Sequence, residues 1–211
     1  MLFILSGDIQ IGKTRFLENL VFQLSKNNIA AYGVLAPGVW IDHGAAEAER
    51  YEKTGINNLL LPENRCIAFA TKKNAKPDGS KAKISTSQSD NAQLAWAIDD
   101  CAIAQVNKHF DSIADKAKAF SLTNSAQSKN AILIVDELGR LELLHEQGLT
   151  SAMALLDQGP TALLPHAILV VRDYLCPHAI KRFESAWQSP CVVGPDEEFQ
   201  KKILNLYRCS S

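Results

Sequence analysis

The sequence lacks an excess of charge of either sign, and it lacks any long apolar run. Lysine and arginine total 22 and aspartate and glutamate total 23, which gives a formal net charge of −1 at pH 7. A balanced charge argues against a dedicated nucleic-acid or acidic-membrane surface. No apolar stretch approaches the roughly 20 residues needed to cross a bilayer. We therefore expect neither nucleic-acid nor membrane partners.

The sequence also lacks paired cysteines. No C-x-x-C motif occurs, so neither a zinc ribbon nor a thioredoxin-type redox site is indicated. The N-terminal segment MLFILSGD has too short an apolar run for a signal peptide and no basic leader. Scattered cysteines are typical of free thiols in a reducing compartment, and we expect a cytoplasmic protein. The five cysteines are Cys66, Cys101, Cys176, Cys191 and Cys209.

Two further motifs are missing. His145 and Glu146 in LHEQGL have no second histidine at the H-E-x-x-H spacing, which excludes a zinc-protease site of that kind. The guanine-binding motif N-K-x-D is absent, because VNKHF has Phe110 where the aspartate belongs. This disfavours a dedicated GTPase switch. The remaining histidines show no ligand spacing and are expected in packing or solvated roles.

Short apolar runs alternate with segments of helical period along the 211 residues. This βαβ pattern is typical of a mostly parallel sheet covered by helices on both faces, which is a three-layer α/β fold. The length favours a single domain over residues 1–211. Strands are predicted at Met1–Leu5, Ala30–Ala36, Asn58–Leu61, Cys66–Ala70, Ala131–Val135, Ala167–Val171 and Cys191–Val193.

Helices are predicted between these strands from apolar side chains three and four residues apart. The longest is expected to start near Trp96 and to carry Ile98, Val106 and Phe110 on its inner face. The last is expected to begin after Asp196, whose carboxylate suits an N-cap. The other helices are predicted from Lys13 to about Asn27, at Thr150–Leu156 and at Pro177–Trp187.

The segment Thr71–Asn91 holds five lysines, two aspartates, no arginine and almost no large apolar residue. Such a composition predicts a flexible Lys-rich insertion in the single domain. A lid that faces bound phosphates is the alternative. Kinases of this size commonly close an arginine-rich lid, so the missing arginines favour water over another acceptor.

The stretch GDIQIGKTRF matches the pattern G-x-x-x-x-G-K-[ST]. Its glycines let the backbone turn so that N–H groups point into one concavity, and the following helix adds its positive N-terminal end. In this pattern Lys13 reaches the β- and γ-phosphates and the Thr14 hydroxyl holds Mg²⁺. We expect Mg²⁺ with ATP or another nucleoside triphosphate. The nucleotide contacts are expected at Gly7, Asp8, Ile9, Gln10, Ile11, Gly12, Lys13, Thr14 and Arg15.

Two acids follow the apolar run Ala131–Val135. In an open parallel sheet, ligands bind at the carboxyl ends of strands. Asp136 and Glu137 are therefore expected to face the phosphates if this strand lies beside the first. Asp136 suits a magnesium role, and Glu137 suits activation of the attacking water. A solvated turn is the alternative for an isolated acidic pair. The glycine loop upstream favours a role for both acids at a nucleotide site.

Arg172 follows the run Ala167–Val171 and is expected at the same edge of the sheet. It is a candidate sensor of the γ-phosphate, and an ion pair with Asp173 is the alternative. The predicted catalytic residues are therefore Glu137, Lys13 and Arg172, and the predicted metal ligands are Thr14 and Asp136.

Together, GDIQIGKTRF and IVDELGRLEL resemble the small P-loop nucleoside-triphosphatase family known from thermophiles and from a human cancer-related NTPase. The family's second signature has the form D-E-I-G-K-M-E-L. The resemblance implies a RecA-like sheet, Mg²⁺-dependent hydrolysis of nucleoside triphosphates with modest base selectivity, and Glu137 as catalytic base. The letter-for-letter matches to the signature are Asp136, Glu137, Gly139, Glu142 and Leu143.

The chain departs from that family in two blocks. Where the family carries T-P-E-V-R, this sequence reads APGVW, with Trp40 in the arginine's place. Where the family carries R-x-G-F, this sequence reads KTGI, with Lys53 in the arginine's place. A positioned arginine contributes about 10³- to 10⁵-fold to turnover in related enzymes. Its loss favours slow hydrolysis or a specialised substrate.

Three functions stay open at this point. The leading hypothesis is a nucleoside triphosphatase, and the nearest alternative is a kinase that moves the same phosphate to a small-molecule hydroxyl or a nucleotide. A slow nucleotide-dependent binding or assembly switch is the third. In each case the expected partner is a nucleoside triphosphate, and the chain is expected to be a monomer or a weak homo-oligomer.

Overall fold

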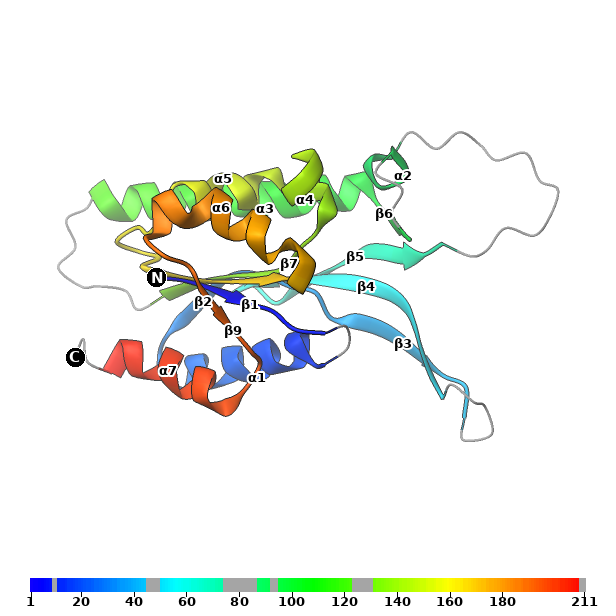
Figure 1. Cartoon of the computed structure of the whole chain (residues 1–211), viewed down its shortest axis with the longest axis horizontal. Coiled ribbons are helices and arrows are strands. Elements are labelled where there is room, and N and C mark those ends of the chain that lie inside the picture. The colour runs from blue at the N-terminus through cyan, green and yellow to red at the C-terminus, as the bar shows by residue number, and fades with distance from the viewer. Residues whose placement is uncertain (9–10, 45–49, 74–86, 92–94, 123–130, 209–211) are drawn as a thin grey trace.

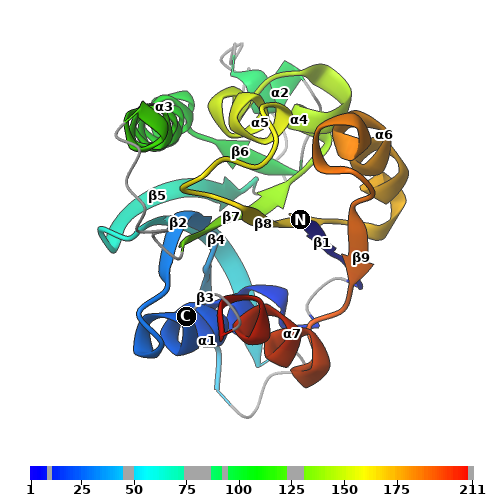
Figure 2. The ribbon, with the colours of Figure 1, turned by 90° about the vertical axis from the view of Figure 1, so that its left-hand side faces the viewer.

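The structure is a computed structural model that describes residues 1–8, 11–44, 50–73, 87–91, 95–122 and 131–208. Within these residues nine strands form one sheet in the order β6-β5-β4-β2-β7-β8-β1-β9, and β3 pairs with β4 outside that row. Helices cover both faces of the sheet (Figures 1 and 2). The predicted three-layer α/β architecture is confirmed.

The central strands are parallel. β2 pairs with β7, β7 with β8, β8 with β1, and β1 with β9. The condition attached to the two acids, that the strand before Asp136 lies beside the first strand, is not met, because β8 lies between β7 and β1. The order of strands along the chain does not determine their lateral order in the sheet. The bounds are β1 Leu2–Leu5, β2 Ala30–Leu35, β7 Ala131–Leu138, β8 His166–Val171 and β9 Cys191–Val193.

An antiparallel extension continues the sheet beyond β2. β4 pairs with β2, β3 and β5, and β6 pairs with β5. The two short strands predicted here, Asn58–Leu61 and Cys66–Ala70, are parts of the longer β4 and β5. β3 was not predicted because Pro37 and Gly38 indicated a stop. The bounds are β3 Gly38–Asp42, β4 Tyr51–Leu61, β5 Arg65–Lys72 and β6 Trp96–Ile98.

The start predicted for the longest helix is wrong. Trp96 and Ile98 belong to β6, and α3 begins at Asp100. Ile98 nevertheless packs against the same small apolar cluster as Ile103 of α3. This shared packing explains why Ile98 matched the apolar period of the helix.

Two layers of helices cover the sheet (Figure 2). α1 (Lys13–Lys26) and α7 (Glu197–Arg208) lie on one face. The backbone N–H of Phe199 donates to the Asp196 carboxylate at 2.8 Å, so the predicted cap of α7 is confirmed. The helices on the other face are α3 (Asp100–Leu122), α4 (Arg140–His145), α5 (Thr150–Asp157) and α6 (Cys176–Trp187), with the short α2 (Gln88–Asn91) beside β6.

Strand residues alternate between two cores. In β1, Leu2 and Ile4 belong to the core on the α3, α5 and α6 side, whereas Phe3 and Leu5 pack with α1 and α7. All four are at most 1% exposed. Burial on both faces explains the continuous apolar runs of the parallel strands. Polar side chains are therefore concentrated where these strands end.

The predicted insertion Thr71–Asn91 is described only at its ends, in β5 and α2. Residues 74–86 lie outside the described residues, as do 92–94. Among the helices of the described residues, none combines the length and apolarity needed to cross a bilayer.

Candidate active site

The glycine loop joins the end of β1 to the start of α1. Gly7 has φ 136° and Gly12 has φ 91°. Residues other than glycine rarely adopt these backbone conformations. A Cβ added at Gly12 would meet no described atom within 4 Å, so glycine is needed there for its φ rather than for space. Ile9 and Gln10 of the predicted loop lie outside the described residues.

Lys13 folds back over this loop from the first turn of α1. Its Nζ donates to the carbonyl oxygen of Gly7 at 2.6 Å and to that of Asp8 at 2.8 Å. The ammonium and the N-terminal end of α1 thus bring positive charge to the same short segment of backbone. This is the arrangement that an anion at the loop requires.

Asp136 lies at the end of β7 and is 4% exposed. One of its oxygens, Oδ2, accepts the backbone N–H of Ala36 at 3.0 Å, which ties β7 to the end of β2. Burial raises the pKa of Asp136 to about 6, while hydrogen bonds from Ala36 and from the Thr14 side chain oppose the rise. Asp136 therefore lies next to Thr14, although β8 separates their two strands.

The register of β7 against β8 shifts between Val135 and Leu138, where Asp136 and Glu137 lie. The Asp136 side chain is buried, whereas 37% of the Glu137 side chain is exposed. The irregular strand end thus places one acid beside Thr14 and the other beside Arg172, after β8. The sequence analysis placed the end of this strand at Val135, before both acids, and that boundary is wrong because β7 continues through them to Leu138.

Arg172 is the first residue after β8, and its Nε donates to Oε1 of Glu137 at 2.8 Å. Partial burial opposes charge on the guanidinium, yet Glu137 is close enough that the pKa of Arg172 is raised. The ion pair predicted for Arg172 is therefore made with Glu137 rather than with Asp173. Two residues predicted as catalytic are in direct contact.

Asp173 instead interacts with Ser6, the residue between β1 and Gly7. The Ser6 hydroxyl is hydrogen bonded to the Asp173 carboxylate and lies 2.9 Å from the carbonyl oxygen of Val171. The Cys176 thiol in turn donates to Ser6 Oγ at 3.1 Å. These contacts hold the start of the glycine loop to the end of β8. The sequence analysis assigned no role to Ser6.

Glu142 supports the segment after the acids. It is 6% exposed, and its carboxylate accepts the N–H of Gly139 at 2.8 Å and the N–H of Leu149 at 3.2 Å. Burial raises the pKa of Glu142, and these two hydrogen bonds oppose the rise. Glu142 thus supplies one half of a capping box at the start of α4, a helix that was not predicted, while Gly139 has no side chain to supply the other half.

Lys53 of β4 also reaches this edge of the sheet. Partial burial lowers the pKa of its ammonium, and the charges of Glu137 and Asp136 oppose that shift. The sequence indicated Lys53 only as a departure from the related family, and it was not among the predicted site residues. Its position depends on the antiparallel extension, which the apolar pattern did not reveal.

Thr14 and Asp136 fit a magnesium ion that is shared with phosphates. Mg²⁺ prefers oxygen ligands and is commonly held by one or two protein groups together with substrate phosphates. The Thr14 hydroxyl and the Asp136 carboxylate supply two such oxygens beside the loop. The buried Asp136 carboxylate has one backbone donor, and a cation would offset the cost of its charge.

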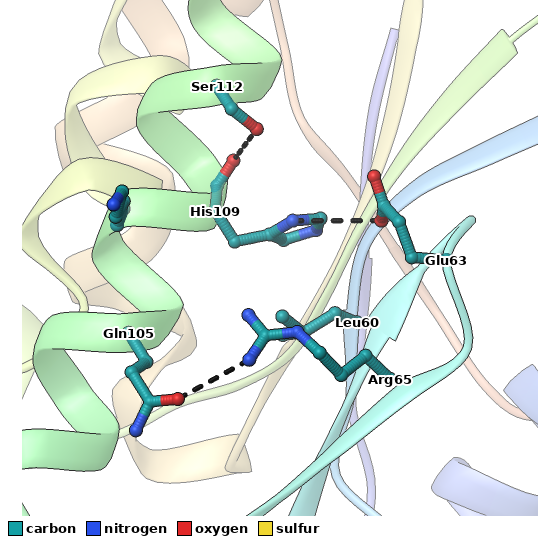
Figure 3. Close-up of a pocket in the computed structure, with 7 residues that line it drawn as sticks. Leu60, Glu63, Arg65, Gln105, His109 and Ser112 are labelled. Carbon is teal, nitrogen blue, oxygen red and sulfur yellow. Dashed lines mark hydrogen bonds and ion pairs between the residues drawn. The ribbon is translucent and has the colours of Figure 1, made fainter.

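A separate hollow of about 420 Å³ lies between α3 and the turn from β4 to β5 (Figure 3). His109 contributes there, with Nε2 3.1 Å from the carbonyl oxygen of Gly33 and Nδ1 3.7 Å from Glu63. The hollow contains none of the predicted site residues. It is lined by Leu60, Glu63, Arg65, Gln105, Lys108, His109 and Ser112.

No protein-family model matches the sequence, and no curated protein matches it. Two solved structures are similar to the chain. The crystal structure of THEP1 from the hyperthermophile Aquifex aeolicus has a TM-score of 0.53 and 15% identity, over 98% of each chain. The solution structure of a human cancer-related nucleoside triphosphatase has a TM-score of 0.58 and 14% identity, over 100% of this chain and 96% of the other.

The chain shares the fold of both proteins. At 14–15% identity the likeness is one of architecture, and it extends across essentially the whole chain. The predicted three-layer α/β fold with a mostly parallel sheet is thereby confirmed. The roles of individual residues rest on the geometry of the site.

Proposed function

We propose that the protein hydrolyses nucleoside triphosphates, ATP among them, to the diphosphate and phosphate with Mg²⁺, as a divergent member of the small P-loop nucleoside-triphosphatase family. One observation carries the proposal: the Gly7–Thr14 loop and the buried Asp136 meet although their strands are not neighbours. The shared fold with a protein described as a nucleoside triphosphatase supports it.

In this mechanism the loop binds the triphosphate. Backbone N–H groups of the loop and the Lys13 ammonium contact the β- and γ-phosphates, so Lys13 exchanges its carbonyl partners for phosphate oxygens. Thr14 and Asp136 hold Mg²⁺, which offsets the negative charge of the phosphate oxygens. The catalytic gain comes from positioning and charge stabilisation rather than from covalent chemistry.

Glu137 orients the attacking water and accepts its proton. The oxygen of water forms a bond to the γ-phosphorus while the bond from that phosphorus to the β–γ bridging oxygen breaks. The electron pair of the broken bond stays on the diphosphate. Arg172 donates to Glu137 at 2.8 Å, and this contact with the proposed base supports the proposed role of Arg172 as a sensor of the γ-phosphate.

We also propose that the protein acts in the cytoplasm as a monomer or weak homo-oligomer. Cys66 and Cys101 are exposed free thiols in different elements, which suits a reducing compartment. The balanced charge supports a small-molecule partner rather than nucleic acid.

Phosphate release from a panel of nucleoside triphosphates tests the proposal. We expect release with ATP and at least one other triphosphate, loss of release on chelation of Mg²⁺, and no need for an added acceptor. Transfer that depends on a small-molecule or nucleotide acceptor would instead show a kinase. Tight triphosphate binding without release or transfer would show a nucleotide-dependent switch.

A further inference from the structure

Lys53 enters the site from the antiparallel half of the sheet. Leu35, the last residue of β2, pairs with Leu59, and the earlier part of β4 pairs with β3 beyond that point. Lys53 lies in this earlier part, opposite Trp40. β3 and β4 extend on the side of the molecule where α1 begins (Figure 1). Lys53 thus approaches Asp136 and Glu137 from an element independent of α1 and β7.

Gly38 makes room for the lysine side chain. A Cβ at this position would lie 2.8 Å from Cε of Lys53 and 2.7 Å from Nε1 of Trp40, closer than real Cβ contacts. On the other side, Lys53 Nζ lies 5.7 Å from the centre of the Trp96 ring, a cation–π distance. Two tryptophans and a glycine therefore lie beside this side chain.

The ammonium of Lys53 is half-buried, and its charge interacts with those of Glu137, Asp136 and Arg172. Among the described residues, no carboxylate oxygen lies within 4.0 Å of its Nζ. A half-buried cation without an ion-pair partner is costly, and a bound anion would offset that cost. The neighbouring groups are those proposed to surround the γ-phosphate.

We propose that Lys53 is a catalytic residue that contacts the terminal phosphate and stabilises the charge that develops on the transferred phosphoryl group. This inference rests on the proposed hydrolysis of nucleoside triphosphates and identifies a second lysine for that reaction. Lys53 stays protonated throughout, and the proton of the attacking water goes to Glu137. Lys13 binds from the α1 side, and Lys53 supplies the cation from β4.

A purely structural role for Lys53 makes a different prediction. If the ammonium only balances Asp136 and Glu137, its removal affects triphosphate and diphosphate binding alike. If it contacts the terminal phosphate, its removal weakens only the binding of a ligand that has that phosphate. A comparison of diphosphate and triphosphate binding therefore distinguishes a structural role of Lys53 from contact with the terminal phosphate, without any measurement of turnover.

The test compares Lys53→Met, Lys53→Arg and a matched control, Lys201→Met on the exposed surface of α7. Calorimetry measures the affinity of each for Mg²⁺–ADP and for the Mg²⁺ complex of a non-hydrolysable ATP analogue. Lys53→Met should lose at least about tenfold in affinity for the triphosphate and less than twofold for the diphosphate. Lys53→Arg should restore most of the loss, and Lys201→Met should match wild type.

Turnover provides the second measurement. Lys53→Met should lower kcat for phosphate release about 10²-fold, the effect typical of removing one group that stabilises transition-state charge. Equal affinity of Lys53→Met and wild type for the triphosphate analogue, or an equal loss for both ligands, would overturn the assignment. Absence of phosphate release from wild type would overturn the proposed hydrolysis, while the affinity comparison still decides whether Lys53 contacts the terminal phosphate.

Discussion

Arg172 and Glu137, the first residue after β8 and an acid at the end of β7, are joined by a hydrogen bond of 2.8 Å. The proposed γ-phosphate sensor and the proposed base are therefore neighbours where two adjacent strands end. A change in the charge or position of one of these side chains therefore affects the other. This relationship determines how variants of either residue should behave.

Glu137→Gln should keep its affinity for Mg²⁺–ATP and lose about 10²- to 10⁴-fold in turnover. Glutamine retains an oxygen that can accept from Arg172, but it cannot take a proton from water. Calorimetry and phosphate release measure the two effects. Glu63→Gln, in the separate hollow, is the control and should behave as wild type. Wild-type release from Glu137→Gln would remove this residue from the mechanism.

Arg172→Ala and Glu137→Gln should have non-additive effects on turnover. Residues in direct contact usually show interaction free energies, whereas distant residues do not. The test is a double-mutant cycle, in which phosphate-release rates are measured for wild type, the two single variants and the double variant. A double variant whose loss equals the product of the two single losses would show that the ion pair has no part in catalysis.

Lys13→Ala should abolish measurable nucleotide binding, because the ammonium that contacts the loop carbonyls is then missing. Calorimetric titration with Mg²⁺–ATP measures the loss. Lys26→Ala, at the other end of α1, is the matched control and should bind as wild type. Affinity unchanged in Lys13→Ala would refute the phosphate-binding assignment of the loop.

Asp136→Asn should make the free protein more stable at pH 8. The folded protein holds the Asp136 proton up to about pH 6, whereas an unfolded chain releases it near 3.8, so stability falls as the pH rises from about 4 to 6. That difference corresponds to about 3 kcal/mol as an upper estimate. Asparagine carries no charge and keeps an oxygen for the Ala36 N–H.

Urea denaturation at pH 5 and pH 8, without Mg²⁺ or nucleotide, measures this effect. The gain in stability of Asp136→Asn over wild type should be larger at pH 8 than at pH 5. The raised pKa of Glu142 acts in the same direction, but it is common to both proteins and cancels. A gain that does not change with pH would contradict the interpretation.

Local patterns in the sequence predicted much of the fold. The apolar stripe of α1, the buried run of β8 and the cap at Asp196 each depend on residues close together in the chain. The same is true of the glycine loop, where Gly7 and Gly12 have positive φ values that glycine adopts readily. These features need no information about distant segments.

The order of the strands across the sheet was less predictable. Nothing in the apolar pattern indicates that β8 separates β7 from β1, or that Lys53 reaches Asp136 and Glu137 from β4. Both depend on which strands pair, and many pairings satisfy the same pattern of apolar residues. Glu142 is a different case, because its partners Gly139 and Leu149 lie close to it in the chain.

The position of β8 has a consequence for synthesis of the chain. The loop at Gly7–Thr14 is made first, but its strand is joined to β7 and Asp136 only through residues 166–171. Domains fold as units while the chain emerges from its N-terminus. A growing chain that lacks β8 therefore has the glycine loop but cannot yet bring Asp136, the proposed metal ligand, beside it. Nucleotide can stabilise the protein by mass action only after that strand has been made.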